Sequence, residues 1–125
     1  MPVTSEVDHE NQVTIFEVTG VATFEEGLET NKTFYDGDPT KNVIWDFSKA
    51  DLSNITNEQF HSIVDSVKNL TGKREGGKTA FLVSRDLEYG ISRMIGMFSE
   101  INISPLQTQV FKSMDKAIQW FNEER

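Results

Sequence analysis

Two short runs of consecutive apolar residues constrain the fold of this chain more than any other feature. These runs are Val-Ile-Trp at 43–45 and Ala-Phe-Leu-Val at 80–83, and neither alternates with polar residues. Such runs are typical of parallel strands that are covered on both faces. Between them lies one apolar stripe at helical spacing, made of Phe60, Ile63, Val64, Val67 and Leu70. The strand–helix–strand order predicts a βαβ unit with a right-handed crossover.

The same alternation of strands and helices continues along the chain. Turn residues and β-branched runs predict strands at 3–7, 12–19, 42–47, 79–84 and 107–111. Helices are expected at 24–35, 57–70, 87–100 and 114–121, behind the caps Thr23, Thr56, Asp86 and Ser113. The sequence therefore predicts an α/β fold of order β-β-α-β-α-β-α-β-α. Its open sheet has about five strands, mostly parallel with the first antiparallel, and it carries four helices.

Size and composition favour a single soluble domain over residues 1–125. A chain of 125 residues suits one core, and the absence of cysteine excludes disulfides and thiolate metal sites. The first ten residues are polar and acidic, with no apolar stretch typical of a signal peptide. No apolar run approaches the roughly 20 residues that span a bilayer. We expect a cytoplasmic, bacterial protein without a membrane span.

The negative charge lies in the N-terminal third. The net charge of the whole chain is −8, and residues 1–38 already account for it, because they hold nine acids and one base, Lys32. A solvated surface that keeps the protein soluble accounts for this excess. Because negative charge repels phosphate backbones, we expect no nucleic-acid partner.

One string of residues matches a nucleotide-binding motif. Residues 72–79 (Gly-Lys-Arg-Glu-Gly-Gly-Lys-Thr) fit the Walker A pattern, which needs a strand before the loop and a helix after it. Here a helix precedes the loop and a strand follows, so we interpret the string as a glycine turn. The two histidines, His9 and His61, do not have metal-ligand spacing, and no G-x-S-x-G elbow is present. We expect no cofactor, no metal and no enzymatic activity.

Several segments together resemble a known group of proteins. They are the strand Asn-Val-Ile-Trp-Asp-Phe at 42–47, the glycine turn, Leu-Glu-Tyr-Gly-Ile-Ser-Arg-Met at 87–94, and Val-Phe at 110–111 before Ala-Ile-Gln-Trp-Phe at 117–121. From about residue 13 to residue 121 the chain resembles the SpoIIAA-like, STAS/SEC14-type domain proteins, which are short stand-alone bacterial chains. The resemblance implies a SpoIIAA-like fold and a non-enzymatic interaction or regulatory module with an unknown protein partner.

The resemblance also implies a place to look for a phosphorylation switch. In the anti-sigma-factor antagonists of that superfamily, a serine in a D-S-x-G context is phosphorylated after the strand that matches Asp46. The loop here has no D-S-x-G, and its nearest hydroxyls are Ser53 and Thr56. Thr56 is better explained as a helix cap. We therefore predict no phosphorylation site.

The carboxyl ends of the parallel strands are where open α/β sheets usually bind ligands. Charged and aromatic residues follow the strands at that edge: Asp46, Arg85, Asp86, Tyr89 and Arg93. They suit a small anionic or polar ligand, or a peptide of a partner. Helix caps and surface ion pairs are the alternative use of the same residues.

A second hypothesis for the function is a small-ligand or lipid-binding protein with an apolar pocket near the third helix.

The elements that cover the two faces of the sheet bear on the oligomeric state. Repeated right-handed βα units put successive helices on one face, whereas the runs at 43–45 and 80–83 need cover on both faces. Either the helices divide between the faces or a second subunit supplies the cover. Apolar residues extend beyond the core stripe of the third helix, namely Met97, Ile101 and Ile103. We therefore predict a homodimer that uses this surface.

Overall fold

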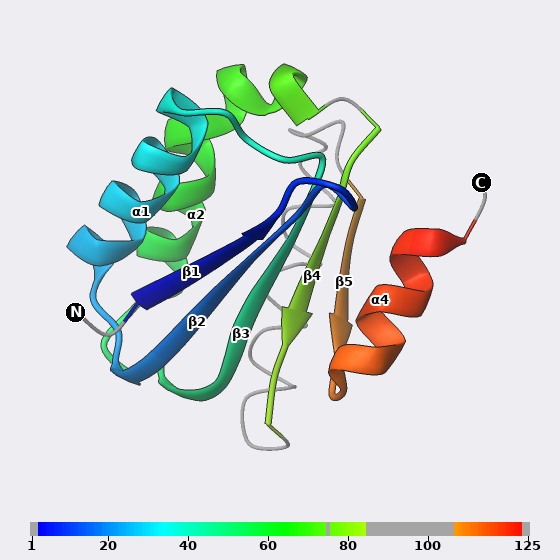
Figure 1. The fold of residues 1–125 in the computed structure, drawn as a ribbon. Helices are drawn as coiled ribbons and strands as arrows, with labels where there is room; N and C mark the ends of the chain where they lie inside the picture. Colours follow the sequence, from blue (N-terminus) through cyan, green and yellow to red (C-terminus); the bar gives the residue numbers. More distant parts are fainter. Residues whose placement is uncertain (1–2, 75, 85–106, 124–125) are drawn as a thin grey trace.

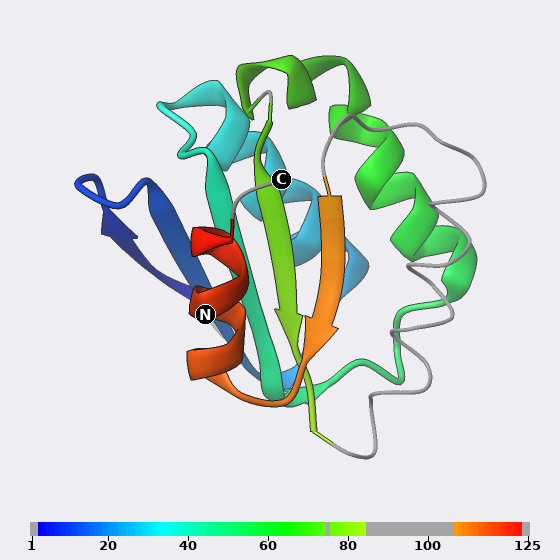
Figure 2. The same ribbon diagram turned by 90° about the vertical axis from the view of Figure 1, so that its right-hand side faces the viewer.

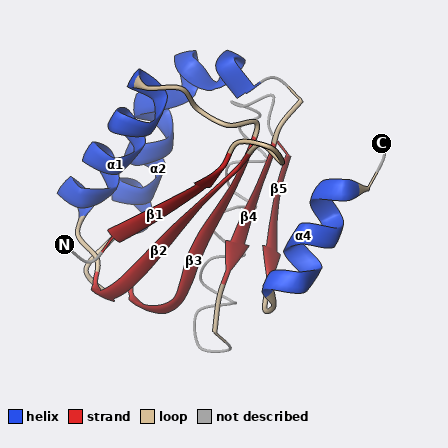
Figure 3. Cartoon of the chain, viewed as in Figure 1, coloured by secondary structure: helices blue, strands red, loops and turns tan. Residues whose placement is uncertain are grey.

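Five strands form one mixed sheet in the computed structural model, which describes residues 3–74, 76–84 and 107–123 (Figure 1). The strands are β1 (Val3–Asp8), β2 (Val13–Val21), β3 (Asn42–Asp51), β4 (Lys78–Leu82) and β5 (Gln107–Phe111). The helices are α1 (Phe24–Asp36), α2 (Asn57–Val67), the 3-10 helix η1 (Lys68–Arg74) and α4 (Met114–Asn122) (Figure 3). The bounds of β5 are those predicted from the sequence.

The strands lie in the sheet in the order in which they occur in the chain. β1 is antiparallel to β2, and β2, β3, β4 and β5 are mutually parallel. This confirms the predicted α/β class and the mixed sheet. The described ranges contain three α-helices where four were expected, and the expected helix at 87–100 lies outside those ranges.

Helices cover both faces of the sheet. α1 and α2 lie on one face and α4 lies on the other, as the two views at right angles make clear (Figures 1 and 2). One core cluster, on the α1–α2 face, contains Val18, Phe47, Leu52, Phe60, Phe81 and Val83. The second, under α4, contains Ile44, Ala80, Leu82 and Ala117. The division of the helices between the faces therefore meets the need of β3 and β4 for two-sided cover.

β2 and β3 extend further than the sequence pattern predicted. β3 was expected to end at residue 47 and β2 at residue 19, but main-chain pairing continues to Val21 opposite Asp51. Gly20 stays within β2 at a φ of 69° and pairs with Ala50. Gly20 misled the prediction for β2, and the polar residues after Phe47 misled it for β3, because strand pairing depends on backbone groups and tolerates both.

The predicted helix caps at Thr23, Thr56 and Ser113 are present. Gln59 N–H donates to Thr56 Oγ1 (3.1 Å), and Thr56 N–H donates to the Gln59 side chain (3.0 Å). Lys116 N–H donates to the Ser113 hydroxyl (3.2 Å). These contacts satisfy backbone donors that the first helical turn leaves unpaired, so local sequence sets where the helices begin. No helix in the described ranges has the length and apolar character needed to cross a membrane.

The Walker-like string is a helix-to-strand turn, as predicted. It runs from η1 into β4, and its lysine, Lys78, is buried. The Lys78 ammonium donates to the carbonyl oxygens of Trp120 (2.5 Å) and Glu123 (3.2 Å) at the end of α4. It also lies 5.1 Å from the centre of the Trp120 ring. Lys78 thus stabilises the carboxyl end of α4, where a helix favours positive charge.

The buried Arg74 side chain also stabilises this turn. It is only 3% exposed, and its guanidinium donates to Thr40 O, Lys41 O, Tyr35 Oη, Lys78 O and Thr79 Oγ1 at 3.0–3.1 Å. Burial lowers the pKa of Arg74, and the Tyr35 hydroxyl partly opposes this effect. The side chain therefore ties the end of α1, the α1–β3 loop and the start of β4 together.

Candidate functional site

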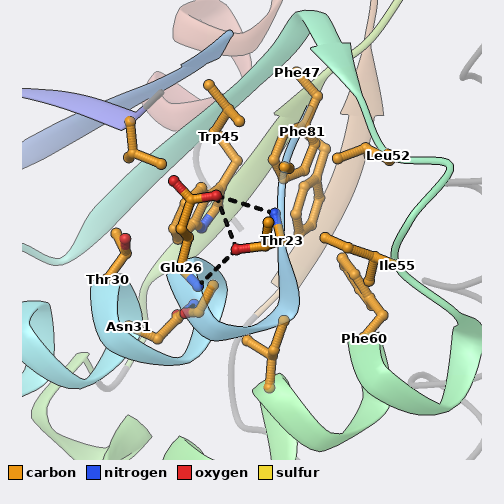
Figure 4. Close-up of a pocket in the computed structure, with 15 residues that line it drawn as sticks. Thr23, Glu26, Thr30, Asn31, Trp45, Phe47, Leu52, Ile55, Phe60 and Phe81 are labelled. Atoms are coloured by element: carbon orange, nitrogen blue, oxygen red, sulfur yellow. Dashed lines mark hydrogen bonds between the residues drawn. The ribbon is translucent and has the colours of Figure 1, made fainter. Parts of the chain in front are cut away.

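An apolar pocket lies at the edge of the sheet where β2 and β3 end and where α1 and α2 begin (Figure 4). Its volume is about 90 Å³. Residues of the β2–α1 junction, the β3–α2 loop and both helices line it, among them Ala22, Thr23, Leu52, Ile55 and Phe60. This is the carboxyl edge of the parallel strands, the place at which open α/β sheets bind ligands.

Aromatic side chains from neighbouring strands form the floor of the pocket. Trp45 and Phe47 alternate along β3 and point to the α1–α2 face, with ring centres 5.9 Å apart. Phe47 stacks on Phe81 of β4 at 5.8 Å, and Phe81 contacts Phe60 of α2 at 6.3 Å. Large flat rings from three elements leave space between them that smaller side chains of the helices do not fill.

The first turn of α1 supplies the polar side of the pocket. Thr23 and Glu26 form a capping box: Glu26 N–H donates to Thr23 Oγ1 (3.2 Å), and Thr23 N–H donates to Glu26 Oε1 (3.2 Å). The Thr23 hydroxyl also donates to Glu26 Oε1 (2.8 Å). Figure 4 shows these contacts beside Trp45. The box begins the helix and at the same time fixes a carboxylate at the pocket wall.

A glycine lets α1 and α2 approach each other below the pocket. A Cβ added at Gly27 would lie 2.6 Å from Ile63 Cδ1, closer than side-chain carbons normally come. Both residues line the pocket. Glycine in a helix interior costs roughly 1 kcal/mol relative to alanine. Close helix contact at this level therefore depends on Gly27.

The outer rim of this edge combines an exposed apolar side chain with polar loop residues. Val21, at the tip of β2, is 49% exposed and pairs with Asp51 of β3. The Asp51 carboxylate accepts a hydrogen bond from Ser53 N–H (2.9 Å). Hydrogen bonds from the Ser53 side chain and backbone lower the pKa of Asp51. Ser53 and Asn54 are exposed beside it, so the loop presents its polar groups outward.

Comparison with known proteins identifies the fold. No family model and no curated protein sequence matches the chain. A solved DUF3478-family protein with a SpoIIAA-like fold, from Shewanella loihica PV-4, matches with a TM-score of 0.61 at 17% identity, over 95% of this chain and 91% of its own. Bacillus SpoIIAA in the phosphorylated form matches with a TM-score of 0.50 at 17% identity, over 94% and 97%. The chain has the SpoIIAA-like fold.

The anti-sigma factor antagonist SpoIIAA in its unphosphorylated form gives a similar match, with a TM-score of 0.50 at 16% identity over 94% of this chain and 96% of its own. The resemblance drawn from the sequence is thus confirmed at the level of the fold.

Asp46 lies away from the pocket in this SpoIIAA-like sheet. It stands between Trp45 and Phe47 on β3, and because strand side chains alternate, it points to the α4 face. Its carboxylate accepts hydrogen bonds from the Ser48 backbone (3.0 Å) and the Ser48 hydroxyl (2.6 Å). β3 continues for five residues beyond it, so Asp46 is not at the end of its strand.

The other predicted site residues lie elsewhere in the chain. Four of them are outside the described ranges: Arg85, Asp86, Tyr89 and Arg93. Ser53 and Thr56 are both exposed in the β3–α2 loop, and Thr56 caps α2 as predicted. The binding roles of Arg85, Asp86, Tyr89 and Arg93 stay predictions.

Sequence reasoning missed the pocket itself. It assigned Trp45 and Phe81 to buried strands, and in the structure Phe81 is buried in the core cluster with Trp45 packed against it. A void between core side chains depends on how their shapes fit, and no local pattern records that fit. The one usable signal was the set of aromatic residues on a single face of β3 and β4, namely Trp45, Phe47 and Phe81, together with Gly27 near the start of α1.

Proposed function

We propose that this chain is a non-enzymatic regulatory module of the STAS type, which binds a partner protein through the carboxyl edge of its sheet. The observation that carries the proposal is the match of nearly the whole chain to SpoIIAA, an anti-sigma factor antagonist. An antagonist of an anti-sigma factor acts on another protein. The same fold over the same length supports an interaction role by analogy, and the surface of the site has to carry it.

The surface of the carboxyl edge supports a protein contact. Val21 is half exposed and pairs with Asp51, and the exposed polar residues Ser53 and Asn54 follow Asp51 in the β3–α2 loop. An apolar centre with a polar rim is the usual composition of a contact patch between proteins. Ile55, partly buried beside the pocket, continues the apolar surface inward.

The experiment is capture from the native host followed by mass spectrometry, with the wild-type chain and two variants as baits. Val21→Arg places a charge at the centre of the patch, and we expect it to lose the partner. Ile118→Arg is the matched control, because Ile118 is 43% exposed on α4, on the other face of the sheet. A partner that both variants retain, or that both lose, would contradict the proposal.

We expect binding to be independent of phosphate on the β3–α2 loop. Ser53 follows Asp51 at a distance of two residues, and its backbone N–H already donates to that carboxylate. A phosphate on Ser53 would stand beside a negative charge, which is unfavourable. Intact-mass spectra of protein from its host should show no phosphate, and stoichiometric phosphate at Ser53 or Thr56 would overturn this expectation.

A small apolar ligand is a second candidate function, favoured by the pocket. At about 24 cal/mol per Å³ of cavity, filling about 90 Å³ stabilises the fold by up to about 2 kcal/mol. This pocket lies under α1 and α2, whereas the sequence analysis expected an apolar pocket near the third helix, at 87–100. Native mass spectrometry of freshly isolated protein should then show an added mass, which Ala22→Leu removes by filling the space. No added mass in the wild type would exclude this candidate.

We also propose that the chain forms a homodimer, as the apolar residues Met97, Ile101 and Ile103 suggest. They lie outside the described ranges. A dimer contact of this kind buries on the order of 1,200–2,000 Å² in total. Light scattering at micromolar concentration should give a dimer mass that Met97→Glu reduces. A monomer mass for both proteins would refute the dimer.

A further inference from the structure

The first strand of the chain lies at the edge of the sheet beside a groove. Among the described strands, β1 pairs with β2 alone, and it ends the strand order (Figure 1). An edge strand presents outward N–H and C=O groups that can pair with a further strand. Next to it, a groove of about 470 Å³ runs between β1 and α1. The edge and the groove together form a surface distinct from the carboxyl-edge patch around Val21.

The groove has an apolar interior. Val7 is 45% exposed and forms one wall, and Phe34 of α1 forms the other. Thr14 and Phe16 of β2 form the floor, and the Phe16 and Phe34 rings meet edge to face at 5.5 Å. Val7 pairs with Thr14 in the sheet, so its side chain lies on the groove side of β1. A half-exposed valine in the same groove as two aromatic rings favours apolar side chains from a partner.

The opposite side of β1 is acidic. Glu6 pairs with Ile15 and Asp8 pairs with Val13, so both acids point away from the groove, and both are exposed. Asp8 accepts hydrogen bonds from the Asn11 side chain (2.7 Å) and backbone (3.1 Å). These contacts lower the pKa of Asp8, with the side-chain contact the larger cause. A strand added next to β1 would therefore have negative charges beside every second residue.

The charged residues that line the groove are acidic. Glu29 of α1 and Asp38 of the α1–β3 loop line it, with His9 of the β1–β2 turn. These residues belong to the first 38, which carry the whole net charge of −8. Charge complementarity therefore calls for a basic partner.

We propose that β1 and this groove bind an extended, basic peptide segment of a partner protein as an added strand. Its apolar side chains, at every second position, enter the groove beside Val7 and Phe34. Its Lys or Arg side chains, at the positions between, lie beside Glu6 and Asp8. The alternation follows from the period of two along a strand. The proposal goes beyond the carboxyl-edge function and does not depend on it.

The charges distinguish this partner from a second copy of the chain. Two β1 strands paired edge to edge would bring Glu6 and Asp8 of both copies onto one face. Like charges in neighbouring cross-strand positions are destabilising. A basic strand turns the same positions into opposite-charge pairs.

The test uses three fluorescein-labelled hexapeptides, the length of β1. They are alternating Lys-Val, a block peptide of three Lys and three Val, and alternating Glu-Val, each measured by fluorescence anisotropy. We expect saturable binding of alternating Lys-Val, at least about tenfold weaker binding of the block peptide, and none of Glu-Val. Added salt should weaken the binding. Equal affinity for the alternating and block peptides would overturn the proposal, because it would show charge attraction without strand addition.

Variants locate the binding surface. Val7→Lys and the double variant Glu6→Lys with Asp8→Lys should each lower the affinity for alternating Lys-Val by about tenfold or more. Ile118→Lys and Val21→Arg should leave it unchanged, which separates this surface from the carboxyl edge. A β1 variant that fails to fold would also lose binding, so hydrogen exchange of the wild type is measured as well. The peptide should slow exchange of β1 amides. Unchanged β1 exchange, or slow β1 exchange in a dimer without peptide, would contradict the proposal.

Discussion

Arg74 provides the sharpest test of how this fold is held together. Its guanidinium is almost fully buried, and all of its acceptors in the contacts described above are uncharged. The substitution Arg74→Met keeps a long side chain of similar bulk and removes every donor. It leaves three backbone carbonyls, the Tyr35 hydroxyl and the Thr79 hydroxyl without this partner.

The expected cost follows from those five contacts. A buried acceptor left without its donor costs about 1–3 kcal/mol, and relief of the buried charge returns several kcal/mol. We expect a net loss of about 3–5 kcal/mol in the free energy of unfolding, because five unpaired acceptors together cost more than the relief of one buried charge returns. For a chain of this length, that lowers Tm by roughly 10–20 °C.

Urea unfolding, followed by circular dichroism and by the fluorescence of Trp45 and Trp120, measures this loss. Lys73→Met is the matched control, since Lys73 is the exposed neighbour and makes one hydrogen bond, from Nζ to Tyr35 O (2.7 Å). We expect the control to lose less than about 1 kcal/mol. If Arg74→Met were no less stable than Lys73→Met, the reasoning about buried donors here would be refuted.

Three further substitutions test other parts of the fold. Lys78→Met should lower the free energy of unfolding by about 1–3 kcal/mol and change the fluorescence of Trp120, because the end of α4 loses its two contacts with the ammonium group. An unchanged free energy of unfolding would contradict the anchoring role. Gly77→Ala should prevent stable folding, since the added Cβ would lie 2.0 Å from Lys41 O, whereas Gly72→Ala meets nothing within 4 Å and should be tolerated in the same thermal melt. Thr23→Ala should cost about 1 kcal/mol in urea unfolding as the capping box is lost, and no loss would show that the box does not stabilise α1.

Local chemistry made much of the fold predictable. The cap at Thr23, the cap at Ser113 and the turn before β4 depend on residues within a few positions of each other, so the sequence records them directly. The apolar runs at 43–45 and 80–83 likewise indicated burial on two faces, and α1, α2 and α4 supply that cover.

Contacts between distant residues were not predictable in the same way. The acceptors of Lys78 on α4 are 42 and 45 positions away, so the sequence suggested a turn lysine and not a helix anchor. Asp46 was expected at the end of its strand, but main-chain pairing carries β3 on to Asp51. The pocket depends on how the rings of Trp45 and Phe81 fit, which is a property of packing and not of any one segment.

The measurement that tests the proposed function most directly is calorimetric titration of the captured partner, once purified, into three forms of the chain. These are the wild type, Val21→Arg and Ile118→Arg. We predict at least about tenfold weaker binding for Val21→Arg and unchanged affinity for Ile118→Arg. Equal affinity of the wild type and Val21→Arg would contradict a partner site at the carboxyl edge of the sheet.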